Sequence, residues 1–212
     1  MDGRRASRSG GGVVVAVTRR AFAGFLGATA ALGALGGATR AFAGDGSLLR
    51  PPGGQDEAQF ISRCVKCDRC RSVCHTGAIT LATVEDGFLN ARTPTLDFHR
   101  GICDFCDDCA RVCATGAIVP FNEETEKIGI AVVQSDRCLS YSQSCEDCVN
   151  ACPYQAITLD SGRHPVVDAD LCNGCGVCEN VCPALVYGQF AGGKRRGIVV
   201  RPASEVEGYV VR

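Results

Sequence analysis

Apolar positions beyond residue 60 come in short stretches between polar and glycine-containing segments, without the long 3.6-residue periodicity of an amphipathic helix. Two stretches, residues 130–133 and 165–167, are rich in β-branched side chains and predict strands. Four others predict a short helix or turn that leads into a strand, and these are residues 77–81, 116–119, 155–159 and 184–187. The order strand, loop, short helix, strand recurs along the chain, which predicts an α+β, loop-rich fold.

The first 43 residues have a different pattern, which is typical of an export signal. Arg19 and Arg20 stand before a weakly apolar, Gly- and Ala-rich stretch over residues 21–38, and residues 41–43 have the A-x-A form of a cleavage site. Glycine breaks the stretch, which is also poor in Leu and Ile; this disfavours a membrane-spanning helix, although an uncleaved signal would still tether the chain. We therefore predict a twin-arginine (Tat) signal peptide over residues 1–43, which exports a folded protein to the periplasm.

Composition and charge narrow the classes of protein further. The chain has 16 Cys among 212 residues, no Trp and one Met, which is typical of a metal or disulfide scaffold and not of a large aromatic core. Six of its 22 basic and one of its 23 acidic residues lie within residues 1–43, which leaves 16 basic and 22 acidic side chains. This acidic balance argues against nucleic acid as a partner, because phosphate contacts need clustered Lys and Arg.

All the cysteines fall into four runs, which we number in chain order: run 1 (64–74), run 2 (103–113), run 3 (138–152) and run 4 (172–182). Runs 1, 2 and 4 share the spacing C-x2-C-x2-C-x3-C, and run 3 differs only in a first gap of six residues. The predicted ligands are Cys64, Cys67, Cys70, Cys74, Cys103, Cys106, Cys109, Cys113, Cys138, Cys145, Cys148, Cys152, Cys172, Cys175, Cys178 and Cys182.

This spacing is typical of [4Fe–4S] ligation. Three cysteines at intervals of three wrap a loop around one cluster, and the fourth, which we expect at a helix start, reaches the neighbouring cluster. Four runs therefore predict four [4Fe–4S] clusters. Disulfides fit poorly because bridges between such close thiols would be strained, and structural zinc prefers Cys pairs separated by a long spacer.

Each run with its flanking helix and strand resembles the half-module of a bacterial ferredoxin, so four runs predict two pseudo-symmetric two-cluster modules. The expected domains are a linker over residues 44–60, a four-cluster ferredoxin-like domain over 61–190 and a C-terminal tail over 191–212. The tail is expected to be a solvated end or an edge strand.

Other side chains give no sign of substrate chemistry. The sequence has no Ser/His/Asp set, nucleophile elbow or phosphate-binding glycine loop, and every cysteine is already assigned to a run. Of the histidines, His75 replaces the proline that follows runs 3 and 4, and we expect it to fill a solvated turn; the alternative is a hydrogen bond to a cluster. His99 and His164 are expected at the surface. These features predict an electron carrier without a catalytic site of its own.

Several motifs together resemble the NapG/MauM family of periplasmic ferredoxin-type proteins. They are the twin-arginine signal, residues 49–53 (LRPPG), residues 129–133, the widened run 3 and the whole of run 4 (CNGCGVCENVC). The resemblance implies electron relay from a membrane-bound quinol-oxidising iron–sulfur protein to a periplasmic reductase or cytochrome acceptor. Its methylamine branch implies the alternative of an accessory or maturation ferredoxin for a periplasmic amine dehydrogenase.

Similarity to the iron–sulfur subunits of molybdopterin oxidoreductases further implies a nested pairing, of run 1 with run 4 and of run 2 with run 3. The spacing alone leaves open a sequential pairing of run 1 with run 2 and of run 3 with run 4, because the linkers have comparable lengths.

Overall fold

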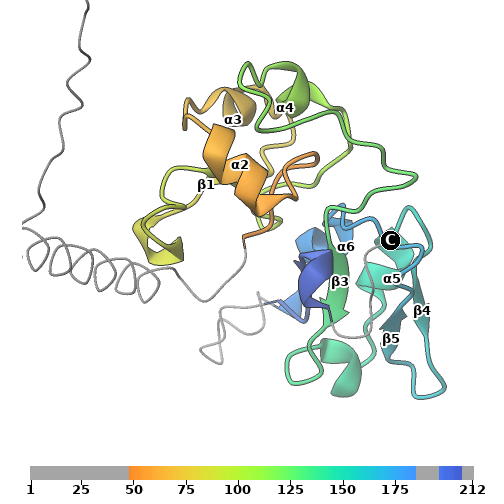
Figure 1. The fold of residues 1–212 in the computed structure, drawn as a ribbon. Helices are drawn as coiled ribbons and strands as arrows, with labels where there is room; N and C mark the ends of the chain where they lie inside the picture. Colours follow the sequence, from red (N-terminus) through yellow and green to blue (C-terminus); the bar gives the residue numbers. More distant parts are fainter. Residues whose placement is uncertain (1–47, 185–195, 207–212) are drawn as a thin grey trace, which may run out of the picture. The chain divides into compact units, whose positions relative to one another are not determined.

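The computed structural model describes residues 48–184 and 196–206 (Figure 1), so the predicted signal peptide lies outside the described residues. All described residues fall within one compact unit, Ala43–Arg212. The helices are α2 (Glu57–Arg63), α3 (Arg69–Val73), α4 (Asp108–Arg111), α5 (Asp147–Ala151) and α6 (Val177–Val181). The strands are β1 (Ile79–Leu81), β2 (Pro94–Leu96), β3 (Ile130–Val133), β4 (Ile157–Leu159), β5 (Pro165–Val167) and β6 (Ile198–Arg201). Within these ranges, no helix is both long and apolar enough to cross a membrane.

The strands form two-stranded antiparallel sheets rather than one large or closed sheet. In the described part of the chain β1 pairs with β2, β4 with β5, and β3 with β6. Three registers are Ile79 opposite Leu96, Ile157 opposite Val167 and Ile130 opposite Arg201. The strands predicted within residues 77–81, 130–133, 155–159 and 165–167 are confirmed.

The strand predicted within residues 116–119 is wrong. This segment contacts the LRPPG motif (residues 49–53) and not another strand. The N–H of Val119 donates to the carbonyl of Gly53 at 3.1 Å. Gly53 has φ +82°, and a Cβ at this position would lie 1.8 Å from the carbonyl oxygen of Val119. The close passage of two backbones therefore replaces strand pairing here. Of the fourth predicted segment, residues 184–187, only Ala184 is described.

Residues 48–60, predicted as part of a linker, are packed into the fold. Asp56 caps helix α2 by accepting the N–H of Gln59 at 3.0 Å. Phe60 is fully buried, and Arg50 lies with its guanidinium carbon 4.6 Å from the centre of the Phe60 ring. The Arg50 guanidinium, which is 3 % exposed as a residue, donates to both carboxylate oxygens of Glu57 at 2.7 and 2.5 Å and to Thr93 Oγ1 at 2.7 Å. This buried network ties the segment to the loop before β2.

Part of the predicted C-terminal tail forms a strand, in agreement with the expected edge strand. Strand β6 pairs along its whole length with β3, and Ile198 is 1 % exposed. The described residues 196–206 thus belong to the packed domain. Residues 191–195 and 207–212 of the predicted tail lie outside the described ranges.

Buried side chains gather in two core clusters that mix apolar residues with cysteine. The first contains Phe60, Phe98 and Ile118 together with cysteines of runs 1 and 2. The second contains Ile157 and Ile198 together with cysteines of runs 3 and 4. The cores are small, and sulfur forms a large part of each.

Candidate iron–sulfur cluster sites

Helices α3 to α6 place the last two cysteines of each run. The third cysteine is the second residue of its helix in every run, as the bounds of the four helices show. The fourth cysteine caps the C-terminal end of the helix in runs 1, 3 and 4 and directly follows the cap, Val112, in run 2. The expectation that the fourth cysteine lies at a helix start is wrong, because the short helix separates the third cysteine from the fourth.

The three compact runs share one backbone conformation around their second cysteine. The residues directly before and after it are left-handed, with φ between +57° and +81°. They are Lys66 and Asp68 in run 1, Phe105 and Asp107 in run 2, and Gly174 and Gly176 in run 4. Left-handed residues of this kind turn successive N–H groups into the loop, a geometry that surrounds anionic groups and Fe–S centres. In run 3 the matching Glu146 has φ −134°, because the wider first gap changes the loop.

The sixteen cysteines come together in four groups, and each group takes three cysteines from one run and the fourth from another. We number these groups by the run that supplies three. Site 1 is Cys64, Cys67, Cys70 and Cys113; site 2 is Cys103, Cys106, Cys109 and Cys74. Site 3 is Cys138, Cys145, Cys148 and Cys182; site 4 is Cys172, Cys175, Cys178 and Cys152. Sites 1, 2 and 4 each line a common cavity, and the thiols of site 3 interact electrostatically with one another.

Run 1 therefore exchanges its fourth cysteine with run 2, and run 3 with run 4. The nested pairing implied by the molybdopterin enzymes is wrong for this structure, which has the sequential pairing that the spacing left open. The physical reason is helix packing: α3 packs against α4, and α5 against α6. Each helix thereby carries its terminal cysteine toward the loop of its neighbour.

Burial makes the thiols poor acids until a metal replaces their protons. It raises the pKa of Cys70, Cys103 and Cys148 to about 12 and that of Cys109 to about 11. Neighbouring sulfurs add to the increase, because one thiolate disfavours the next. Iron bound to such a group would supply the positive charge that ionises the thiols.

Backbone N–H groups donate to several of the sulfurs. The N–H of Ile118 lies 3.3 Å from Cys113 Sγ, that of Gly197 lies 3.3 Å from Cys182 Sγ, and that of Ala131 lies 3.5 Å from Cys172 Sγ. Burial raises the pKa of Cys113, but the backbone N–H groups of Ile118, Ala117 and Thr115 and the Thr115 hydroxyl outweigh it, so the pKa falls below its usual range. Such donors stabilise negative charge on sulfur and raise the reduction potential of a bound cluster.

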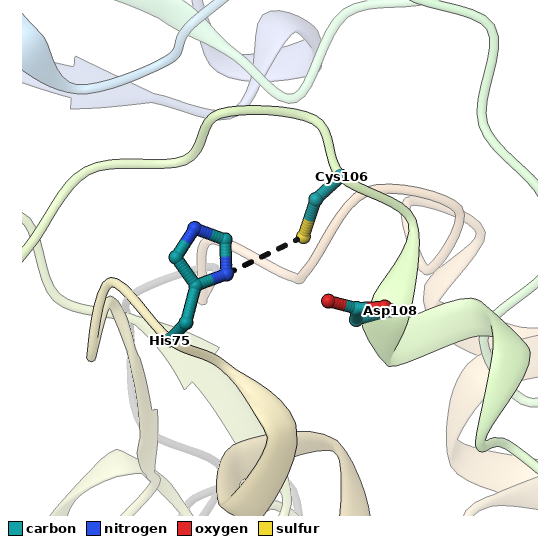
Figure 2. Close-up of side chains that lie close together, drawn as sticks. All are labelled: His75, Cys106 and Asp108. Atoms are coloured by element: carbon teal, nitrogen blue, oxygen red, sulfur yellow. Dashed lines mark hydrogen bonds between the residues drawn. The ribbon is translucent and has the colours of Figure 1, made fainter.

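His75 points at site 2 and does more than fill a turn (Figure 2). Its Nδ1 lies 3.9 Å from Cys106 Sγ, and its Nε2 lies 2.8 Å from Asp104 Oδ2. Ligand atoms of His75, Cys106 and Asp108 all lie within 4.8 Å of one another. Because Cys106 belongs to site 2, this group is the rim of that site. The contact agrees with the alternative in which His75 interacts with a cluster ligand.

The other two histidines have partners as well. His99 is exposed, as predicted, but its Nε2 lies 3.5 Å from Glu179 Oε1. His164 is half-buried rather than exposed, with its ring stacked on Tyr141 at 3.9 Å between centroids.

Sequence reasoning missed Lys127, which positions the loop of run 4. Its ammonium donates to the carbonyls of Ala169, Asp170 and Cys172 at 2.8, 2.7 and 2.9 Å. The cysteine pattern carries no signal for this residue, because Lys127 lies far from run 4 in the sequence.

Comparison with known proteins matches all four runs to iron–sulfur proteins. The family described as "4Fe-4S dicluster domain" matches residues 63–117 (runs 1 and 2), 102–156 (runs 2 and 3) and 142–186 (run 4 and the last three cysteines of run 3). "Ferredoxin-type protein NapG" of Escherichia coli (strain K12) is 38% identical over 175 residues, 74% of this chain and 75% of the relative; the Shigella flexneri protein matches equally. "Ferredoxin-type protein NapF" of E. coli (strain K12) is 31% identical over 138 residues, 64% of this chain and 80% of the relative.

Proposed function

Because the chain belongs to the NapG-like family of ferredoxin-type iron–sulfur proteins with 4Fe–4S dicluster domains, we propose that it binds four [4Fe–4S] clusters and relays electrons between two partners. The observation that carries this proposal is the exchange of the fourth cysteine between paired runs, which gives each of the four sites four sulfur ligands and leaves no cysteine over. The proposal includes two pseudo-symmetric modules, one with sites 1 and 2 and the other with sites 3 and 4.

Each bound cluster would accept and release one electron at a time. The chain itself supplies the sulfur ligands, the N–H donors that tune them and the apolar walls that keep water away. Ile79 and Ile118 are 5 % and 3 % exposed beside sites 2 and 1, and Ile157 is 4 % exposed beside site 4. These walls lower the local dielectric constant and so affect the potential of a bound cluster.

We propose that the protein is exported by the Tat route and works in the periplasm. Its electron donor would be a membrane-bound quinol-oxidising iron–sulfur protein and its acceptor a periplasmic reductase or cytochrome. The twin-arginine motif and the family resemblance support this assignment, and similarity to NapG and NapF favours relay over an accessory role for an amine dehydrogenase. Replacement of Arg19 and Arg20 by Lys should retain the protein in the cytoplasm, whereas a wild-type distribution of that variant would contradict Tat export.

The central experiment is anaerobic purification followed by iron and sulfide analysis and a redox titration monitored by EPR. Four clusters require about sixteen iron and sixteen sulfide per chain. The reduced signals should disappear reversibly on oxidation. About half that iron, with disulfides in place of ligands, would contradict the proposed loading, and clusters that cannot be reduced reversibly would contradict electron relay.

A further inference from the structure

The two pairs of sites meet at a contact between predicted ligands. The backbone N–H of Cys103 in site 2 donates to the backbone carbonyl of Cys175 in site 4 at 2.9 Å. From this contact we infer that the four clusters form a line in the order site 1, site 2, site 4, site 3, which differs from their order in the sequence. The inference rests on the proposed four-cluster loading.

Glycine allows the close approach of the run 4 loop at this junction. Gly176 has φ +81°, and a Cβ there would lie 2.1 Å from the ring of Phe98. Gly174 has φ +76°, and a Cβ there would lie 2.5 Å from the carbonyl oxygen of Gly129. A larger side chain at position 176 would separate the loop of run 4 from Phe98 in the segment that leads into run 2, and one at position 174 would separate it from Gly129 before β3. The glycines of CNGCGVC therefore serve the junction as well as the loop.

An aromatic contact joins the same two sites. Phe105, between the first two cysteines of run 2, packs edge-on against Tyr154 with centroids 6.4 Å apart and an interplanar angle of 81°. Tyr154 follows Cys152 of site 4 by two residues and lines the cavity of that site. On its other side Phe105 stacks on Phe121 at 5.7 Å. This aromatic contact joins sites 2 and 4 independently of the Cys103–Cys175 hydrogen bond.

Other contacts tie each of the remaining two sites to its own neighbouring loops. Near site 1, Lys66 donates to the carbonyl of Leu89 in the loop between β1 and β2. Near site 3, Glu146 pairs with Arg163, and Cys182 Sγ accepts the N–H of Gly197. Sites 1 and 3 lie at the two ends of the line because each exchanges a cysteine with one inner site, site 1 with site 2 and site 3 with site 4.

Burial distinguishes site 4 from site 1. The three run 4 cysteines of site 4 are 7 to 9 % exposed, whereas Cys67 of site 1 is exposed. An inner position suits a site that is closed to outside partners. Each transfer along the line moves one electron, so one cluster is oxidised as the next is reduced and no bond forms or breaks. The membrane donor and the periplasmic acceptor would therefore exchange electrons at sites 1 and 3.

Two-cluster variants test the order by spin–spin interaction in EPR spectra of the fully reduced protein. Cys64→Ser with Cys138→Ser leaves sites 2 and 4, and these should give a broadened, interacting spectrum. Cys64→Ser with Cys172→Ser leaves sites 2 and 3, and these should give the sum of two isolated signals. Interaction in the second variant, with or without interaction in the first, would overturn the order.

Spin quantitation distinguishes a wrong cluster order from a failure to load the clusters. About two spins per chain in each variant show that the two remaining sites are filled. If purified wild-type protein lacks about sixteen iron, the proposed function fails and the order is irrelevant.

A hydrogen-exchange measurement decides the order if a double variant does not load. In the wild-type holoprotein the amide of Cys103 should exchange slowly, and Gly176→Ala should accelerate its exchange at least tenfold by pushing Phe98 away. The matched control is Gly77→Ala, which has the same left-handed backbone (φ +73°) but no atom within 4 Å of the added Cβ. Unchanged exchange at Cys103 in Gly176→Ala would overturn the junction.

Discussion

The left-handed residues beside the second cysteine show how single positions balance strain against ligation. A non-glycine residue in this region costs about 1–2 kcal/mol, yet Lys66 and Asp68 in run 1 and Phe105 and Asp107 in run 2 adopt it. The loops accept this cost because the backbone must curl around a cofactor. Run 4 has glycine at both positions because other segments of the chain pass close to them. The left-handed conformation alone would not require glycine, as runs 1 and 2 show.

We therefore expect Gly176→Ala to cost more than Gly77→Ala in anaerobic denaturation of the holoprotein. Both changes add a Cβ at positive φ, which costs about 1 kcal/mol. Only Gly176→Ala also meets a ring, Phe98 at 2.1 Å, so its total cost should be about 2–4 kcal/mol. Equal losses in the two variants would show that Phe98 moves freely.

A second prediction at this scale concerns Glu179, a buried carboxyl that accepts the N–H of Val200 at 2.7 Å and faces His99. Burial raises its pKa to about 6, above the usual 4.5. Because the folded state prefers the protonated form, the associated stability is present below pH 4.5 and is lost as the pH rises through 6. At pH 7.5 the buried carboxylate costs about 2 kcal/mol.

Glu179→Gln keeps an oxygen for Val200 and removes the charge. We expect this variant to be more stable than wild type by about 1–2 kcal/mol at pH 7.5 and nearly equal to it at pH 4. Thermal denaturation of the holoprotein at the two pH values measures the difference, with the exposed Glu205→Gln as the control. A gain of the same size at both pH values would contradict the burial argument.

At the scale of elements, the cysteine spacing predicted more than the apolar pattern did. The repeat of three correctly located the four loops, and the stretches at residues 130–133 and 165–167 became strands β3 and β5. The similar stretch at 116–119 did not, because Gly53 passes within hydrogen-bonding distance of Val119. Local sequence cannot identify a partner that lies so far away along the chain.

The same limit explains the wrong pairing of runs. An edge strand was one of the two expectations for the tail, but its sequence did not indicate that β3 would be its partner. The pairing of runs depends on which short helices pack together. The four helices have similar sequences, so the sequence does not identify which of them pack against each other. Lys127 and Arg50 were missed for this reason too, since their partners are backbone carbonyls or distant side chains.

Exchange of the fourth cysteine makes a direct prediction for Cys113→Ser. Although Cys113 belongs to run 2, the affected cluster should be that of site 1, because Cys113 lines a cavity with Cys64, Cys67 and Cys70. EPR spectra of the reduced variant should show a shifted or lost site 1 signal, identified by its absence in Cys64→Ser. The loss of the site 3 signal instead would restore nested pairing.

For the whole molecule, we expect bound clusters to supply much of the stability of the fold, because the polypeptide alone is only weakly stabilised. Its two-stranded sheets are marginal structures in water, and both core clusters contain cysteine sulfur. Loss of a cluster therefore removes part of a core as well as a redox centre.

The effect should depend on position. Cys175→Ser removes a ligand at the buried junction and should lower the thermal stability of both cores, whereas Cys67→Ser, at the exposed site 1, should affect the first core alone. Hydrogen exchange resolved by segment measures this in the two holoprotein variants. If each change accelerated hydrogen exchange in only one core and to the same extent, the two cores would be energetically independent.

The pairing of β3 with β6 also determines the order in which the two cores can form during synthesis. All buried residues of the first core lie between Leu49 and Ile128, so they can come together while the ribosome is still making runs 3 and 4, and Val200 packs against them last. The second core waits for Ile198, which lies opposite Val133. A chain that stops short of this strand has all sixteen cysteines but lacks the Gly197 N–H that donates to Cys182 and the strand that covers sites 3 and 4. Completion of the last cluster sites is thereby coupled to completion of translation.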